Sequence, residues 1–102
     1  MKFEVIKNQI QSNLREALRR AGYFSITDRF TNKTSYVRRL SATQHYPRFH
    51  LYIIESASRY VFDLHLDQKR VSYRGQRAHS GEDDGPLISE EMARITAGLD
   101  QP

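Results

Sequence analysis

The fold of this chain is organised around the stretch Arg48-Phe-His-Leu-Tyr-Ile-Ile-Glu55, which continues through Ser56-Ala-Ser-Arg59 into Tyr60-Val-Phe-Asp-Leu-His-Leu-Asp67. Both arms alternate apolar and polar residues, which is the period of a strand with one buried face. The small polar segment between them suits a turn of two or four residues. The sequence therefore predicts a β-hairpin with one apolar face and one polar face.

Either turn length gives the hairpin the same register. The apolar face then pairs Phe49 with Leu66, Leu51 with Leu64, and Ile53 with Phe62. The polar face pairs Arg48 with Asp67, His50 with His65, Tyr52 with Asp63, and Ile54 with Val61. A slip by one residue would set the core face of one arm against the polar face of the other, so the pattern favours this register.

The segment before the hairpin predicts a helix and two more strands. Apolar residues recur at three- and four-residue steps over residues 2–21, which indicates an amphipathic helix that stops at Gly22. Residues 23–30 and 35–40 are typical of strands joined by a turn at 31–34. The expected pairs are Phe30 with Tyr36, Ile26 with Leu40, and Asp28 with Arg38.

The segment after the hairpin is irregular and then helical. Residues 68–86 hold three glycines, and Val71–Arg74 within them is a candidate edge strand. Ser89 is the expected N-cap of a helix of about ten residues, whose apolar stripe is Met92, Ile95 and Leu99. The predicted order is α-β-β-β-β-α. This order predicts an α+β two-layer sandwich, with an antiparallel sheet of about four strands and both terminal helices packed on one face.

Length and composition indicate one domain over residues 1–102, with no cysteine for disulfides, thiol chemistry or thiolate metal sites. No apolar run is long enough to span a membrane, so we expect a cytoplasmic protein with no membrane partner. Residues 1–78 carry 15 Lys and Arg against 6 Asp and Glu, whereas residues 79–102 carry only Arg94 against six acidic residues. The acidic tail either tunes polyanion binding by the basic body or packs against that body.

The polar face of the hairpin gathers side chains with chemical potential. This candidate cluster is His50, Asp63, His65 and Asp67, with His79 expected to reach it from the following loop. Histidines beside carboxylates suit a divalent metal or general acid–base chemistry. No HExxH, metal-ligand spacing or nucleophile motif supports either function, so a solvated or partner-binding face and an anion pocket remain alternatives. We assign no catalytic or metal-ligating residue and predict no cofactor.

Basic residues alternate with aromatic ones around the same face, a pattern that suits phosphate contacts and base stacking. The candidate nucleic-acid-binding residues are Arg48, Tyr52, Lys69, Arg70, Tyr73, Arg74 and Arg77, with Tyr46 and either Arg38 or Arg39 beside them. The sequence thus favours a binding module for RNA or single-stranded DNA. The alternatives are a small metal-binding or hydrolase-like protein that uses the His/Asp cluster, and an adaptor with a protein partner.

Overall fold

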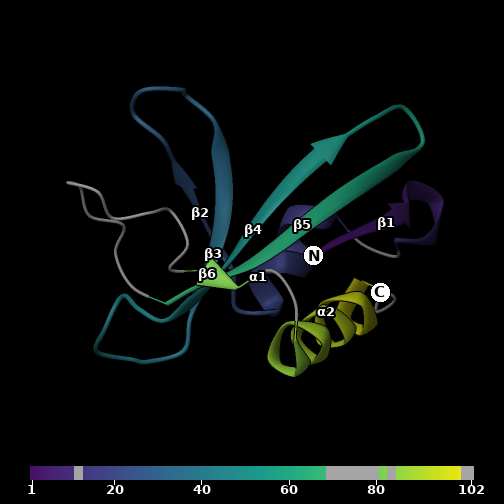
Figure 1. Ribbon diagram of the computed structural model, residues 1–102. Coiled ribbons are helices and arrows are strands. Elements are labelled where there is room, and N and C mark those ends of the chain that lie inside the picture. The colour runs from purple at the N-terminus through teal and green to yellow at the C-terminus, as the bar shows by residue number, and fades with distance from the viewer. Residues whose placement is uncertain (11–12, 69–80, 83–84, 100–102) are drawn as a thin grey trace.

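The computed structural model describes residues 1–10, 13–68, 81–82 and 85–99. These residues form an antiparallel sheet and two helices, which confirms the α+β class (Figure 1). The strands are β1 (Lys2–Ile6), β2 (Phe24–Thr27), β3 (Thr34–Arg39), β4 (Arg48–Glu55), β5 (Arg59–Asp67) and β6 (Gly81–Glu82). The helices are α1 (Leu14–Arg20) and α2 (Pro86–Leu99), and a short 3₁₀ helix, η1 (Lys7–Gln9), follows β1. The strand order is β1-β5-β4-β3-β2, and β6 pairs with β5.

The central hairpin, β4 and β5, has the predicted register. Pairing runs from Arg48 opposite Asp67 to Glu55 opposite Tyr60, and it places His50 opposite His65. At the turn, the Ser56 N–H donates to the Arg59 carbonyl at 2.9 Å. The alternation of apolar and polar residues therefore determined both the pairing and the faces of this hairpin.

One face of the sheet packs against both helices. On the hairpin, Phe49, Leu51, Phe62, Leu64 and Leu66 are buried, and Ile53 is half-buried. The helices add Ala17, Leu18, Ile88, Ile95 and Leu99 to the same core. Full burial of one large apolar side chain stabilises a fold by roughly 1.5–3 kcal/mol, so this shared core is the main source of stability. The opposite sheet face carries the candidate cluster.

The predicted helix over residues 2–21 is wrong in its first half, because Lys2–Ile6 forms the edge strand β1. This strand pairs with β5 and buries Val5, while Phe3 packs edge-on against Phe62 with ring centroids 5.1 Å apart. Phe3 and Val5 also fit a two-residue period, which pairing with β5 selects over the helical period. Strand β1 and the short β6 raise the sheet above the four strands expected.

The second half of that segment does form a helix, which starts and ends for local reasons. The Asn13 side chain accepts hydrogen bonds from the N–H groups of Arg15 and Glu16, so it caps the first turn of α1. The predicted stop is confirmed, because the helix ends at Arg20 and Gly22 has a φ of +98°. This left-handed conformation is one that a side chain disfavours.

The predicted register of the first hairpin is wrong. Strand β2 covers only Phe24–Thr27, and Phe24 lies opposite Val37 rather than in the expected frame. The chain turns earlier than predicted, since the Asp28 carboxylate accepts from the N–H groups of Phe30 and Thr31. Asn32 then adopts a φ of 59° within the same turn. The turn chemistry of Asp28 therefore outweighed the apolar pattern that had placed Phe30 in the strand.

The C-terminal helix α2 is longer than predicted and starts before Ser89. Pro86 is its first residue, a position where the missing N–H of proline costs nothing. The Ser89 N–H instead donates to the Gly85 carbonyl, so Ser89 lies inside the first turn. Neither helix in the described ranges is long and apolar enough to cross a membrane. The candidate edge strand Val71–Arg74 falls outside the described residues.

A buried ionic network ties α2 to the sheet. The Glu91 carboxylate accepts from Tyr23 Oη at 2.6 Å, from Arg94 Nε and Nη2 at 2.8 Å each, and from Arg38 Nη1 at 3.4 Å. Arg94 also donates to the Ala21 carbonyl. Part of the acidic C-terminal segment thus packs against the basic body, which is the second of the two alternatives given for that segment in the sequence analysis. Arg38 points toward the helices, on the core side of the sheet.

Replacement of Gly22 by alanine should destabilise the protein by about 1–2 kcal/mol. A methyl group there would meet the Arg38 side chain at 3.3 Å in a backbone conformation that disfavours any side chain. The matched control is Gly98→Ala in α2, where a Cβ meets nothing within 4 Å. That change should stabilise the helix by roughly 0.5–1 kcal/mol. Denaturant melts of both variants check the pair, and equal effects would contradict the assigned role of Gly22.

Candidate functional site on the outer sheet face

The candidate site lies on the sheet face opposite the helices, here called the outer face. Its side chains come from three neighbouring strands: Ser35, Val37 and Arg39 of β3, Arg48, His50 and Tyr52 of β4, and Asp63, His65 and Asp67 of β5. The face is not uniformly exposed. Val37 and His50 are buried, at 1% and 9% exposure, whereas Tyr52 is 45% exposed. The outer face therefore combines a sheltered centre with an accessible rim.

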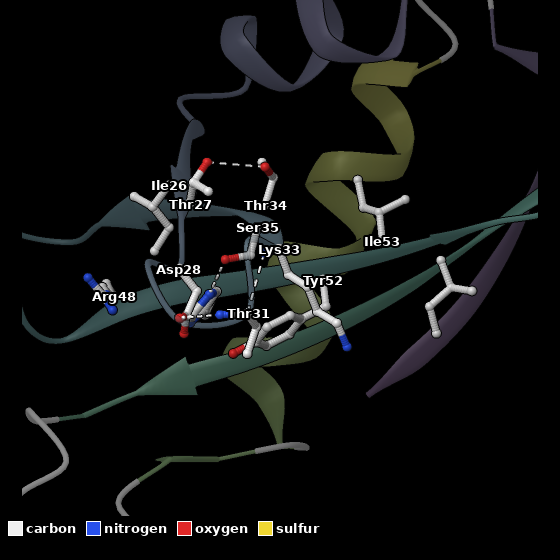
Figure 2. A pocket seen from close by; sticks show the side chains of 12 residues that line it. Ile26, Thr27, Asp28, Thr31, Lys33, Thr34, Ser35, Arg48, Tyr52 and Ile53 are labelled. Carbon is white, nitrogen blue, oxygen red and sulfur yellow. Dashed lines mark hydrogen bonds between the residues drawn. The ribbon is translucent and has the colours of Figure 1, made fainter.

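Strands β3 and β4 separate beside this centre. Their pairing ends at Tyr36 opposite Leu51, although both strands continue toward their hairpin ends. Figure 1 shows the β2–β3 hairpin diverging from the β4–β5 hairpin in a V. A pocket of about 720 Å³ lies there, and its lining includes Ile26, Ser35, His50, Tyr52 and Ile53 (Figure 2). This volume is in the range of small-molecule sites.

Main-chain donors also face this separation. The Asp28 N–H bonds the Lys33 carbonyl, so by alternation the main chain of Thr34 is directed away from β2, toward β4. In the β4–β5 hairpin, the Ser56 N–H donates to the Arg59 carbonyl. By the same alternation along β4, the main chain of Ile53 is directed away from β5, toward β3. Both Thr34 and Ile53 line the pocket. The main-chain N–H and C=O groups of both residues are thus directed toward the pocket between the two strands.

A hydrogen-bonded chain of Ser35, His50 and Asp67 crosses the three strands. Ser35 Oγ lies 2.7 Å from His50 Nε2, and His50 Nδ1 lies 3.0 Å from Asp67 Oδ2. An ionised carboxylate only accepts hydrogen bonds, so Nδ1 carries the proton and donates to Asp67. In the neutral ring Nε2 is then an acceptor, and Ser35 donates its hydroxyl proton to it. Asp67 therefore fixes the tautomer of His50.

The charges around Asp67 keep it ionised. Although burial alone would raise its pKa, the hydrogen bond from His50, together with the hydrogen bond and positive charge of Arg48, holds the pKa of Asp67 below its ordinary value. Arg48 Nε lies 3.4 Å from Asp67 Oδ2, which is the ion pair expected from the register. The Tyr52 ring stacks on His50 with centroids 4.4 Å apart, and partial burial with the nearby Asp67 charge raises its pKa.

Two arginines lie directly opposite each other at the rim of the outer face. Arg39 of β3 pairs with Arg48 of β4, and like charges at directly opposed positions repel. Arg48 is offset by Asp67, while no carboxylate among the described residues forms an ion pair with Arg39. Each guanidinium lies over an aromatic ring: Arg39 is 5.8 Å from the Phe24 centroid, and Arg48 is 4.6 Å from that of Tyr46.

The structure brings together only part of the predicted residues. Within the candidate cluster, His50 contacts Asp67, whereas the other histidine, His65, lies 3.1 Å from Asp63 Oδ1. No group of three or more His, Asp and Glu side chains in the described ranges is arranged to hold a metal ion. His79, Lys69, Arg70, Tyr73, Arg74 and Arg77 lie outside the described residues, so their predicted roles remain sequence-based.

Sequence reasoning missed Ser35, Phe24 and the choice of Arg39 over Arg38. Ser35 occupies an ordinary polar position in an alternating strand, with no motif around it. Its contact with His50 depends on the β3–β4 register, for which neither strand carries a strong signal. Alternation did require Arg38 and Arg39 to face opposite sides, but the buried partner Glu91 was needed to assign them.

No protein-family model matches this chain, and neither the curated proteins nor the solved structures include a significant match to it. The geometry of the outer face is therefore the basis on which a function is proposed for this chain.

Proposed function

We propose that this chain is a module that binds single-stranded nucleic acid through the outer face. The observation that carries the proposal is the opposed pair Arg39 and Arg48. A phosphate placed between the two guanidinium groups would relieve their repulsion and accept a hydrogen bond from each. Arg39 is exposed and has no described acidic partner, so a phosphate would not need to displace one.

Exposed aromatic side chains lie on the same outer face as the arginine pair. Phe24, beside Arg39, is 48% exposed, and Tyr52, two residues along β4 from His50, is 45% exposed. Stacking of a base on an aromatic ring contributes about 1–3 kcal/mol and tolerates any base, so it suits a strand read without sequence preference. As a sequence-based part of the proposal, we expect the basic residues that follow β5 in the sequence, among them Arg70 and Arg74, to add phosphate contacts.

Replacement of Arg39 by alanine should weaken binding of a fluorescent single-stranded oligonucleotide. Loss of one phosphate contact lowers the slope of log affinity against log salt by about 0.7 for a single strand. Fluorescence anisotropy over a salt series, with DNA and RNA oligonucleotides of the same length, measures both the affinity and the slope. We expect a several-fold loss of affinity at low salt together with the reduced slope.

The matched control is Arg19→Ala, which removes the same charge from α1, in the helical layer. The Arg19 side chain is 78% exposed and lies 4.0 Å from Glu16, so its loss should leave the fold intact. This variant should bind the oligonucleotide nearly as well as the unmodified protein. Equal losses in the two variants would show that net charge alone attracts the oligonucleotide, and absence of binding at low salt would refute the proposal.

A further inference from the structure

The Ser35–His50–Asp67 chain has the atom-by-atom connections of a nucleophilic serine site. The serine hydroxyl contacts Nε2, and the carboxylate contacts Nδ1 of the same ring. This order of contacts lets a histidine accept the hydroxyl proton while the carboxylate stabilises the imidazolium that forms. Both distances, 2.7 and 3.0 Å, are within the range that proton transfer and orientation require.

Rigid elements hold these three side chains. Each comes from a different strand of one sheet, β3, β4 or β5, and the strands are paired beside the site. The His50 ring is fixed between its two hydrogen bonds and the stacked Tyr52 ring. The Asp67 carboxylate is held in turn by Arg48. Such support keeps the geometry in place before a substrate arrives, which is what efficient chemistry needs.

The pocket gives a small substrate access to the Ser35 hydroxyl. Ser35 and His50 both line it, although Ser35 is otherwise buried at 7% exposure. Ile26, Ile53 and Ile54 supply apolar lining, which suits a short uncharged acyl group. The Thr34 and Ile53 N–H groups that face the same pocket are the kind of donor that stabilises a developing oxyanion. This chemistry involves neither the oligonucleotide nor Arg39, which forms no hydrogen bond with these three side chains, all of them within the described residues.

We infer that Ser35 is a nucleophile, with His50 as its general base and Asp67 as a positioning residue, and that the pocket hydrolyses small carboxylic esters. Ser35 Oγ forms a bond to the ester carbonyl carbon while its proton moves to His50 Nε2. The carbon–oxygen bond to the leaving alcohol then breaks, and the alcohol takes that proton. Water, deprotonated by His50, attacks the acyl-serine, releases the carboxylic acid and restores the Ser35 hydroxyl. No oxidant or reductant is required.

Covalent labelling tests the inference directly. The full chain is incubated with a fluorophosphonate probe, and intact mass followed by peptide mapping locates the adduct. We expect one adduct per chain, on Ser35, and an initial burst of nitrophenol when p-nitrophenyl acetate is mixed with the protein. Ser35→Ala should abolish both, and His50→Gln should slow both by about 10²–10⁴-fold, the usual contribution of a general base.

Controls separate reactivity from damage to the fold. Ser25 and Ser58 are exposed serines that take no part in the hydrogen bonds among Ser35, His50 and Asp67. The variants Ser25→Ala and Ser58→Ala should therefore label like the unmodified protein. Asp67→Asn replaces an acceptor-only carboxylate with an uncharged amide that can also donate, so the tautomer is no longer fixed and the imidazolium is no longer stabilised. This variant should slow the burst without moving the adduct. Circular dichroism confirms that each variant is folded. An unlabelled Ser35 in the folded protein, or labelling that does not depend on His50, would overturn the inference.

Discussion

Replacement of Glu91 by alanine is expected to destabilise the protein by about 3 kcal/mol. The Glu91 side chain is 4% exposed and accepts hydrogen bonds from three residues on other turns or elements: Tyr23, Arg94 and Arg38. The two arginine side chains are 41% and 32% exposed, so water can partly replace the lost carboxylate. Water cannot reach the Tyr23 hydroxyl in the same way, because Tyr23 is 2% exposed. In the variant this hydroxyl stays buried without its hydrogen-bond acceptor, which accounts for much of the lost stability.

Denaturant melts at neutral pH measure this effect, with Glu90→Ala as the matched control. Glu90 is the preceding residue of α2 and is exposed, so its replacement should change the free energy of unfolding by less than about 0.5 kcal/mol. Similar results for the two variants would contradict the network.

The same network predicts how the difference depends on pH. Burial alone would raise the pKa of Glu91, but Arg94, Tyr23 and Arg38 together hold that pKa below its ordinary value of 4.5. A carboxyl whose pKa is lower in the folded state stabilises the fold fully above the unfolded value, and this stabilisation is lost as the pH falls through the folded value. The difference in the free energy of unfolding between the unmodified protein and the Glu91→Ala variant should thus become smaller below about pH 4.

Replacement of Phe62 by alanine is expected to cost about 3–5 kcal/mol, the usual range for a buried phenylalanine. Phe62 is 0% exposed at the centre of the core face, where it meets the Phe3 ring at 5.1 Å and the Tyr60 ring at 6.3 Å. A protein of this size has roughly 5–15 kcal/mol of total stability, so the variant should be close to unfolding at 37 °C. Thermal melts check this, and Phe62→Leu, with a smaller cavity, should remain folded.

The control for Phe62 lies next to it on the other face. Ile53 is the cross-strand partner of Phe62, and the next residue, Ile54, is on the outer face at 60% exposure. Ile54→Ala should therefore change stability by less than about 0.5 kcal/mol. A loss at Ile54 as large as that at Phe62 would mean that the two faces of the hairpin have been assigned the wrong way round.

The central hairpin could be predicted from sequence because apolar and polar residues alternate along both of its arms. A register shifted by one residue would set the apolar face of one arm against the polar face of the other, so only one register fits the pattern. That register gives both the His50–His65 pairing and the ion pair of Arg48 with Asp67. The N-terminal strand could not be predicted in the same way. Phe3, Ile6 and Ile10 satisfy a helical spacing while Phe3 and Val5 satisfy a strand spacing, and only the exposed edge of β5 decides between them.

The candidate site was only half predictable for a related reason. His50 and Asp67 belong to adjacent arms of one hairpin, so local pattern placed them together. Ser35 reaches His50 across a connection whose length and course set the β3–β4 register, and polar alternation alone does not distinguish it from Ser25. The Asp28 turn shifted the first hairpin further, which moved every expected partner of β3.

The proposal that the outer face binds nucleic acid is tested most directly by nuclear magnetic resonance of the arginine side chains. Each Nε–H group gives its own signal, so Arg39 and Arg48 can be compared with Arg15 and Arg19 of α1 in one titration with a single-stranded oligonucleotide. We expect the Arg39 and Arg48 signals to shift saturably while the α1 signals stay in place. Shifts confined to α1, or signals that all remain unmoved at low salt, would contradict it.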